Sequence, residues 1–221
     1  MKITLAFDVY GTLIDTAGIA IELEHLVGKQ AQAFAERWRD KQLEYSFRKG
    51  LMQDYQNFAV CTQQALEFTD AQLKTNLSSS DKTILLEKYQ HLPTFAEVNS
   101  SLESLKKLDV NIYAFSNGSA DKVTGLLKNA QILDYFTDVV STDEIQTFKP
   151  NPEVYAHFLE RTMATPQQSW LISSNPFDVL GGLNIGMQCA WLQRSSTALF
   201  DPWGQQPTAI IHNLDEIKAL I

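Results

Sequence analysis

The segment from Phe7 to Thr12, Phe-Asp-Val-Tyr-Gly-Thr, places one carboxylate, Asp8, at the end of a short apolar run. That run, Ile3 to Phe7, is typical of a buried parallel strand, and the glycine after it marks a turn. A carboxylate in such a place can act as a nucleophile that forms a covalent ester. Two residues further on, Tyr10 stands where a second carboxylate would support a metal ion or act as an acid. The segment therefore predicts a lone nucleophilic aspartate.

Three more polar groups follow apolar runs: Ser116-Asn117-Gly118, Lys149-Pro150 and the loop from Ser173 to Asp178. Ligands of open α/β sheets bind outside the carboxyl ends of the strands. With Asp8, these groups would supply hydroxyls, an amide, an ammonium group and a second carboxylate. Each alone is a weak signal, because Ser-Asn-Gly is often only a turn and Lys-Pro is usually a solvated loop. Their combination in this order predicts one reactive site.

The elements that must position these groups alternate along the chain. Apolar runs that favour strands occur at 110–115, 139–140, 170–172, 189–192 and 209–211. Helical patterns lie between them, from Val98 to Leu108, Ala120 to Ala130 and Pro152 to Met163. Such alternation predicts an α/β fold with a Rossmann-like parallel sheet and right-handed crossovers.

Residues 16–95 interrupt this alternation. They contain helical patterns at Gln30–Lys49, Asp54–Phe68 and Asp81–His91, with a polar connection at Asn76–Ser80 and few convincing strands. We interpret them as a helical cap domain inserted after the first strand. The core domain then comprises residues 1–15 and 96–221, and the cap domain comprises residues 16–95.

The cap helix that contains Arg39 has two apolar stripes. At 100° per residue, one side carries Phe34, Trp38 and Tyr45, and roughly the opposite side carries Arg39, Leu43 and Phe47. We expect both stripes to be covered, one by the cap itself and the other by the core or a second subunit. Arg39, among apolar neighbours, needs a partner. That partner is either a structural carboxylate or a substrate anion or halide.

Composition excludes several functional classes. The chain has 221 residues, of which 44% are hydrophobic and 20% charged, as in an ordinary globular protein. A net charge of −8 argues against nucleic acid or an anionic membrane as a partner. No apolar stretch approaches the ~20 residues of a membrane span, and residues 1–8 lack the features of a signal peptide. Cys61 and Cys189 are expected to be buried thiols, which suits the reducing cytoplasm.

These motifs resemble the haloacid dehalogenase superfamily over nearly the whole chain. Two activities compete within that resemblance. Its phosphatases use Mg²⁺, because a metal ion must offset the repulsion between a phosphate and an attacking carboxylate. Here Tyr10 and Ser174 occupy positions where those enzymes carry acidic residues, so we expect no tight Mg²⁺ binding. Magnesium-dependent hydrolysis of another small anion remains the alternative, and a retained fold that only binds a ligand is a third possibility.

The motifs are more similar to those of the L-2-haloacid dehalogenases. These are Asp8 to Thr12, Trp38-Arg39, Lys41 to Tyr45, Ser116 to Gly118, Lys149-Pro150 with Tyr155, and Ser173 to Asn175 with Asp178. Two positions depart from that family's pattern. Asp40 stands where an amide is common, and Phe177 stands where a tryptophan often lines the pocket. These departures affect the expected substrate size more than the reaction.

The resemblance implies hydrolysis of small L-2-haloacids to D-2-hydroxy acids through an ester on Asp8, with no metal or other cofactor. The catalytic residues it implies are Asp8, Thr12, Arg39, Lys149, Tyr155, Ser173, Asn175 and Asp178. The substrate-binding residues it implies are Val9, Tyr10, Arg39, Leu43, Phe58, Ser116, Asn117 and Phe177. Simpler roles stay open for three of them: Thr12 in the turn, Tyr155 in helix packing and Asp178 as a helix N-terminal acid. The expected partners are the haloacid, halide and water, and a second subunit in a homodimer.

Overall fold

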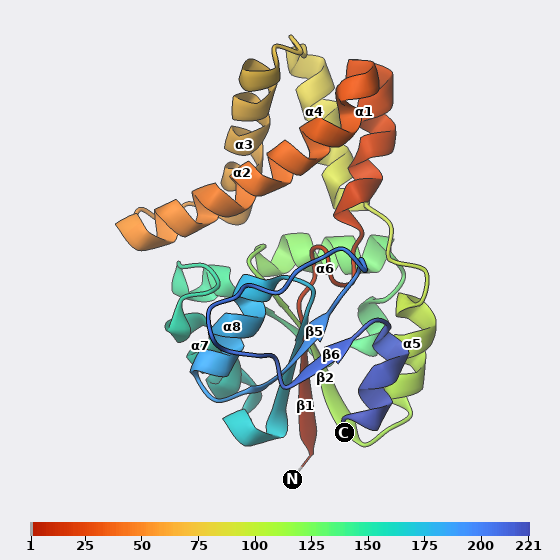
Figure 1. The fold of residues 1–221 in the computed structure, drawn as a ribbon, viewed down its shortest axis with the longest axis vertical. Helices are drawn as coiled ribbons and strands as arrows, with labels where there is room; N and C mark the ends of the chain where they lie inside the picture. Colours follow the sequence, from red (N-terminus) through yellow and green to blue (C-terminus); the bar gives the residue numbers. More distant parts are fainter. Residues whose placement is uncertain (1) are drawn as a thin grey trace.

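A six-stranded parallel sheet forms the centre of the computed structural model, which describes residues 2–221 (Figure 1). Its strands are β1 (Ile3–Phe7), β2 (Val110–Ser116), β3 (Asp138–Ser141), β4 (Ser169–Ser173), β5 (Gln188–Leu192) and β6 (Ala209–Ile211). They lie in the order β3-β2-β1-β4-β5-β6, and each neighbouring pair is parallel. The predicted α/β class is confirmed. Because β1 lies between β2 and β4, the loops after these three strands meet around its end.

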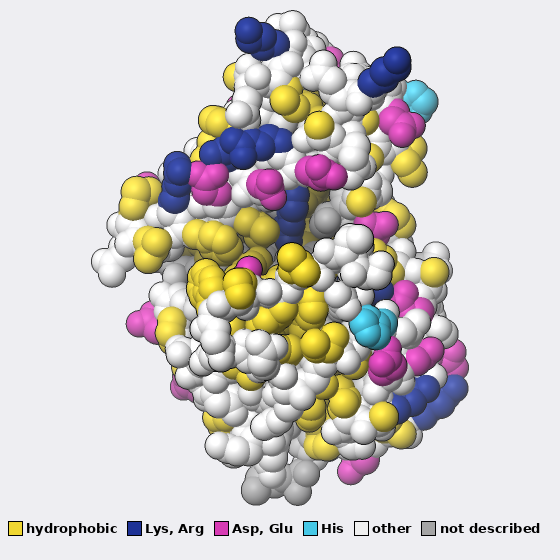
Figure 2. Space-filling model, viewed as in Figure 1, with side chains coloured by type: hydrophobic (Ala, Val, Ile, Leu, Met, Phe, Trp, Pro, Cys, Tyr) yellow, Lys and Arg dark blue, Asp and Glu magenta, His cyan; other side chains and the backbone are white. Residues whose placement is uncertain are grey.

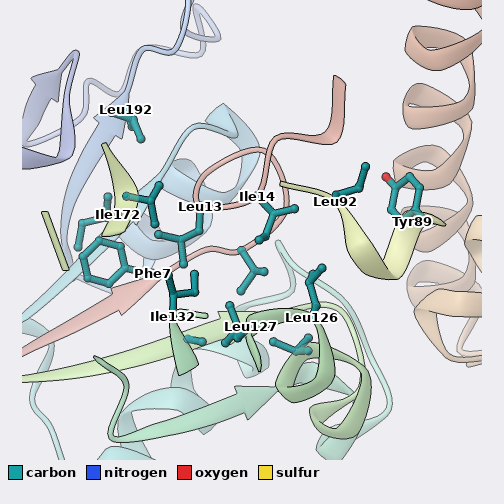
Figure 3. Close-up of a cluster of buried hydrophobic side chains, with 14 of the residues drawn as sticks. Phe7, Leu13, Ile14, Tyr89, Leu92, Leu126, Leu127, Ile132, Ile172 and Leu192 are labelled. Carbon is teal, nitrogen blue, oxygen red and sulfur yellow. The ribbon is translucent and has the colours of Figure 1, made fainter. Parts of the chain in front are cut away.

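Alternate residues of β1 enter two separate hydrophobic clusters. Leu5 and Phe7 pack with helices α5 (Val98–Lys106) and α6 (Ala120–Asn129), while Ala6 packs with α7 (Pro152–Thr162) and α8 (Pro176–Asn184). Successive side chains of a strand point to opposite faces, so both faces of the sheet are covered by helices. Figure 3 shows Phe7 in the first of these clusters. This burial explains why the strands are continuous apolar runs.

Four further helices stand apart from the sheet, beyond the carboxyl ends of its strands (Figure 1). They are α1 (Ile19–Val27), α2 (Ala31–Met52), α3 (Phe58–Leu73) and α4 (Ser79–Lys88). The two chain segments that join them to the sheet run side by side, since Asp15 N–H donates to Pro93 O at 2.8 Å. A helical cap therefore follows the first strand. The domain limits at 15/16 and 95/96 stay a prediction.

The two apolar stripes of α2 are covered as predicted. Phe34 and Trp38 are buried in the larger hydrophobic cluster, with Tyr45 packed against it. On the other stripe, Phe47 makes an edge-to-face contact with Phe177 of α8, at 5.0 Å between ring centroids. One stripe of α2 thus builds the cap, and the other meets the core.

Several element limits differ from those predicted. Helix α1 was not predicted from the sequence, and α8 was indicated only by the possible role of Asp178 as an acid at a helix N-terminus. The second predicted cap helix begins at Phe58 and not at Asp54, because Asn57 caps it by accepting from the Val60 N–H at 3.2 Å. The polar connection predicted at Asn76–Ser80 ends earlier, since Ser78 and Asp81 form a capping box for α4. Within residues 2–221, every helix is too short or too polar to cross a membrane.

Candidate active site

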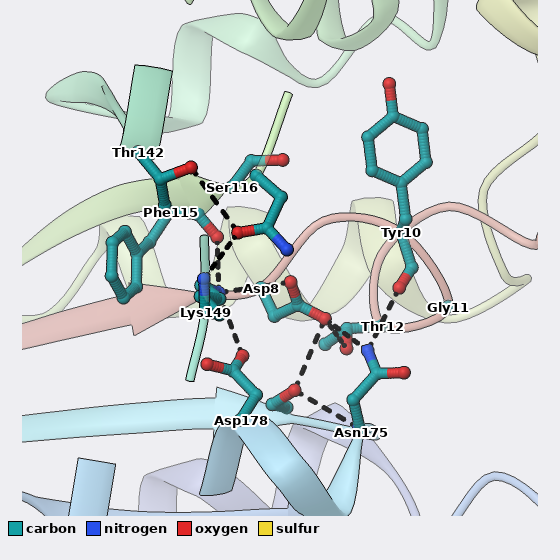
Figure 4. A network of polar contacts seen from close by, with 12 residues as sticks. Asp8, Tyr10, Gly11, Thr12, Phe115, Ser116, Thr142, Lys149, Asn175 and Asp178 are labelled. Atoms are coloured by element: carbon teal, nitrogen blue, oxygen red, sulfur yellow. Dashed lines mark hydrogen bonds and ion pairs between the residues drawn. The ribbon is translucent and has the colours of Figure 1, made fainter. Parts of the chain in front are cut away.

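Asp8 directly follows β1, and its carboxylate is held by three donors on one oxygen (Figure 4). Its Oδ2 accepts from Asn175 Nδ2 at 2.7 Å, from Thr12 Oγ1 at 2.9 Å and from Ser173 Oγ at 3.2 Å. The residue is only 7% exposed. The donors come from the turn after β1 and from the end of β4, the adjacent strand. The fold thus fixes the orientation of this carboxylate before any ligand binds.

Lys149 lies between the two buried carboxylates of the site. Its Nζ donates to Asp8 Oδ1 at 3.2 Å, to Asp178 Oδ2 at 2.8 Å and to the Phe115 carbonyl at 2.9 Å. These three bonds use all the protons of the ammonium group. The same nitrogen lies 4.1 Å from the centroid of the Phe115 ring. Because Lys149 is 2% exposed, its charge acts on both carboxylates with little screening by solvent.

Asp178 lies in the first turn of α8 and is fully buried. Its Oδ1 accepts from the Tyr155 hydroxyl at 2.9 Å. Burial raises the pKa of Asp178 above the usual range of an aspartate and nearby Asp8 adds to this rise, whereas Lys149 and Tyr155 oppose it. Burial also raises the pKa of Tyr155 well above that of a free tyrosine, so its hydroxyl remains a donor. This arrangement gives a carboxylate suited to accepting a proton.

Asn175 stands at the N-cap of α8, yet its side chain makes no capping hydrogen bond. Its Nδ2 instead donates to Asp8 and, at 3.2 Å, to the Tyr10 carbonyl. The next residue back, Ser174, joins the same loops: its N–H donates to Thr12 Oγ1 at 2.9 Å and its hydroxyl to Gly11 O at 2.7 Å. The N-cap side chain of α8 therefore bonds to the segment from Asp8 to Thr12 and not to the backbone of its own helix.

The side chains of Tyr10 and Ser174 supply no carboxylate to a metal ion beside Asp8. Mg²⁺ prefers oxygen ligands in octahedral geometry. The Tyr10 ring packs 5.9 Å from the ring of Phe58, and burial raises the pKa of its phenol. Ser174 is engaged with the backbone, and the Lys149 ammonium occupies the space between the carboxylates. Among residues 2–221, no group of three or more His, Cys, Asp or Glu side chains is placed to hold a metal ion.

Ser116 and Asn117, at the end of β2, are almost fully buried beside this cluster. The Ser116 hydroxyl oxygen accepts from the Gly118 N–H at 3.1 Å. Asn117 Oδ1 accepts from the Lys149 N–H at 2.9 Å and from Thr142 Oγ1 at 3.4 Å. These bonds fix the oxygen end of the Asn117 amide, which leaves its NH₂ group as the end that can meet an anion.

Arg39 reaches this site from the cap. Its Nη1 donates to Gln42 Oε1 at 2.7 Å, and its Nη2 donates to the Tyr10 carbonyl at 3.3 Å. In the described chain, residues 2–221, the guanidinium forms no ion pair with a carboxylate. The structural salt bridge considered from the sequence is therefore not formed, and the positive charge of Arg39 remains available to an anion.

The aromatic side chains predicted to bind the substrate line two different cavities. Tyr10 and Phe58 line one of about 360 Å³. Phe177 lines a different one of about 660 Å³, together with Phe47 and Lys149. Phe177, at the start of α8, contacts Phe47 of α2. The roles of Tyr10, Leu43, Phe58 and Phe177 in substrate binding stay a prediction. Leu43 is half-buried and lines neither cavity, and Val9 is fully buried in the core, so only its backbone can contact a ligand.

Several residues of the site were not predicted from the sequence. Gln42 and Tyr89, which both bond within the cap beside Arg39, were not assigned roles. The Phe115 carbonyl that binds Lys149 carries no sequence signal at all. Gln42 was detectable, since it lies three residues after Arg39 and residues spaced three apart share a helix face.

The chain matches the family model of haloacid dehalogenase-like hydrolases over residues 5–192. It is 33% identical over 217 residues to (S)-2-haloacid dehalogenase 2 of Pseudomonas sp. (strain CBS-3), covering 98% of this chain and 94% of that one. Haloacetate dehalogenase H-2 of Moraxella sp. (strain B) is 32% identical over 217 residues, covering 98% and 96%.

The fold is also similar to a solved structure, the L-2-haloacid dehalogenase of Xanthobacter autotrophicus with chloropropionic acid covalently bound. The TM-score is 0.90 and the sequence identity 28%, with 100% of this chain and 98% of that chain covered. These sequence and structural matches extend over both the sheet and the cap. The protein therefore belongs to the family of haloacid dehalogenase-like hydrolases.

Proposed function

We propose that this protein is an (S)-2-haloacid dehalogenase that converts small L-2-haloacids to D-2-hydroxy acids through an ester on Asp8. The observation that carries this proposal is the ion pair of Asp8 with Lys149 at 3.2 Å, beside an Arg39 guanidinium that has no carboxylate partner among residues 2–221. The bound chloropropionic acid of the Xanthobacter relative supports a covalent step. A 2-haloacid carries one negative charge, and its reacting carbon is not shielded by anionic oxygens, so an ammonium group suffices for charge balance.

In the first step, Asp8 Oδ1 attacks the carbon that bears the halogen, and the carbon–halogen bond breaks as the carbon–oxygen bond forms. Among residues 2–221, Oδ1 accepts only from Lys149, whereas Oδ2 accepts from three donors. The less encumbered Oδ1 is therefore the better nucleophile. Attack from the side opposite the halogen inverts the configuration of the carbon.

Two further sets of groups handle the charges of the substrate. Ser116 and the backbone N–H groups near Tyr10 and Asn117 hold its carboxylate. Arg39 and the amide of Asn117 receive the departing halide, since preorganised donors act most strongly where charge develops. Tyr10 and Phe58, on the wall of the smaller cavity, contact the alkyl group.

In the second step, a water molecule attacks the carbonyl carbon of the Asp8 ester. Asp178 accepts a proton from this water, and Lys149 holds Asp178 in place. The charge that develops on Oδ2 is met by Thr12, Ser173 and Asn175, which already donate to it. When the ester bond breaks, Asp178 returns its proton to the departing alkoxide oxygen, which gives the hydroxy acid. The second proton of the water is released to solvent, and Asp8 is restored as a carboxylate that carries an oxygen from water.

Chloride release from L-2-chloropropionate in the presence of EDTA tests the proposal. We expect release to continue unchanged after chelation, because Lys149 supplies the positive charge. Release of phosphate from a generic ester that stops on chelation would instead favour the magnesium-dependent alternative. Protein that releases neither product would favour a non-catalytic role. A parallel series with chloro-, bromo- and fluoroacetate would define substrate size.

The raised pKa of Asp178 predicts an acid limb of the pH–rate profile above the usual range of an aspartate. The Tyr155 hydroxyl stabilises the ionised carboxylate, so Tyr155→Phe should raise the pKa of Asp178 and move the acid limb to higher pH. The pH dependence of kcat measures this shift. Tyr113→Phe, in the same hydrophobic cluster, is the control and should leave the limb unmoved. If the acid limb does not move in Tyr155→Phe, the ionisation of Asp178 does not control the pH dependence of kcat.

We also propose a homodimer in the cytoplasm. Cytoplasmic location is supported by two free, buried cysteines, Cys61 and Cys189. Dimer formation is supported by the apolar surface between the end of α2 and the core (Figure 2). There Leu51 is 87% exposed and Trp203 is 75% exposed, beside the larger cavity. An exposed patch of this kind usually marks an interface between proteins.

A charge placed in this patch should separate the subunits. We expect Leu51→Glu to convert a dimer to a monomer in sedimentation experiments, because an unpaired carboxylate would be buried at the interface. Met163, 94% exposed at the end of α7, offers a matched control, and Met163→Glu should remain dimeric. A monomeric wild-type protein would refute the dimer.

A further inference from the structure

The side chain of Gln42 is fully buried in the cap, one turn along α2 from Arg39. Its Oε1 accepts two hydrogen bonds, from Arg39 Nη1 at 2.7 Å and from the Tyr89 hydroxyl at 3.2 Å. Its Nε2 donates to Thr62 Oγ1 at 2.6 Å. A buried amide with both ends bonded is costly to disturb, since a lost partner leaves a polar atom without compensation.

The direction of this amide is determined by its neighbour Thr62. The Thr62 hydroxyl donates its single proton to the Phe58 carbonyl at 2.9 Å. It can therefore only accept from Gln42, which requires the nitrogen of the amide to face Thr62. The oxygen of the amide must then face Arg39. In this way the packing of α3 against α2 sets where the guanidinium lies.

The neutrality of Gln42 is as important as its position. A glutamate at this position would have nearly the same shape and would also accept from Arg39, but its carboxylate would neutralise the guanidinium. Arg39 has no carboxylate partner within the described chain, and its Nη2 donates to the Tyr10 carbonyl near Asp8. The amide thus orients the guanidinium and leaves its full charge available to an anion.

We infer that Gln42 is a positioning residue, which aims the uncompensated charge of Arg39 at the halide that leaves when Asp8 attacks. This inference rests on the proposed function, which makes Arg39 the halide acceptor. Gln42 itself touches no reacting atom. Its contribution should therefore depend on the presence of Arg39 and on the leaving group.

The test compares Gln42→Glu and Gln42→Leu with the same changes at Gln72. Gln72 holds another arginine of α2, since Arg37 Nε donates to Gln72 Oε1 at 2.6 Å, but this pair is exposed and outside the site. We expect both Gln42 variants to slow single-turnover halide release by roughly 10- to 100-fold. The loss should be larger for L-2-chloropropionate than for L-2-bromopropionate, because chloride is the poorer leaving group. The Gln72 variants should retain wild-type rates.

A second comparison separates positioning from a purely structural role. In an Arg39→Ala background, adding Gln42→Leu should change the rate by less than about threefold, because residues that act through one another are not additive. Equal losses with and without Arg39 would overturn the inference, as would a wild-type rate in Gln42→Glu. Crystal structures of the wild type and of Gln42→Leu would show whether the Arg39 guanidinium moves, which is a measurement independent of activity. If the wild-type protein releases no halide, the proposed function is wrong. If the Arg39 guanidinium keeps its position in Gln42→Leu, the positioning role of Gln42 is wrong.

Discussion

Asp8→Asn should abolish halide release, with a loss of at least about 10³-fold in kcat. The amide oxygen of asparagine is a far poorer nucleophile than a carboxylate, although it fills the same space. The fold should persist, because Lys149 still pairs with Asp178 at 2.8 Å. Halide release by ion chromatography measures the loss, and the thermal unfolding midpoint reports the fold.

A single turnover of wild-type protein in ¹⁸O-labelled water provides the complementary measurement. Water attacks the ester carbonyl, so the label should be found in the peptide that contains Asp8. Label found only in the hydroxy acid would contradict the covalent intermediate. The control for the Asp8→Asn variant is Asp109→Asn, which makes the same change at an exposed aspartate that pairs with Lys2. This control should keep its activity. Any activity that returns slowly in Asp8→Asn should accompany deamidation, detectable by mass.

Lys149→Met should remove activity as completely, by at least about 10³-fold, and should also destabilise the protein. The substitution leaves two buried carboxylates, on Asp8 and Asp178, without their shared cation. Removing one partner of a buried ion pair costs about 3–5 kcal/mol. Chemical denaturation measures the free energy of unfolding, and halide release measures the catalytic loss.

The destabilisation by Lys149→Met should depend on pH. The pKa of Asp178 is already raised by burial, and loss of the Lys149 ammonium raises it further. The folded state of the variant then binds a proton more tightly than the unfolded state. Its stability should therefore increase as pH falls through the folded-state pKa and decrease as pH rises. A stability deficit that does not change with pH would contradict this account.

Two further variants separate charge from packing at Lys149. Adding Asp178→Asn to Lys149→Met should recover part of the stability, since one uncompensated charge is removed, but no activity. Lys41→Met is a matched control in the cap, where a buried lysine pairs with the partly exposed Glu44 at 2.6 Å. We expect it to leave halide release unchanged. Recovery of activity in the double variant would argue against Asp178 as the proton acceptor.

The amino-acid sequence by itself identified the fold class and the chemical groups of the candidate site. Buried parallel strands require continuous apolar runs, and the residues after them stand out as polar interruptions, as Asp8 and Ser116 do. Both signals are local, so they can be read without knowing how the chain folds. Helix α1 was missed although the sequence contains a signal for it, since Ile19, Leu23 and Leu26 recur at helical spacing.

Which atoms meet depends on the tertiary structure. Asp8, Lys149 and Asp178 are far apart in sequence, and they follow β1, β3 and β4, so their contacts depend on the strand order β3-β2-β1-β4. Likewise, the docking of the cap on the core brings Arg39 to the Tyr10 carbonyl and Phe47 to Phe177. Periodicity specifies the face of each element, but distances between elements arise from packing across the whole molecule, which no local pattern encodes.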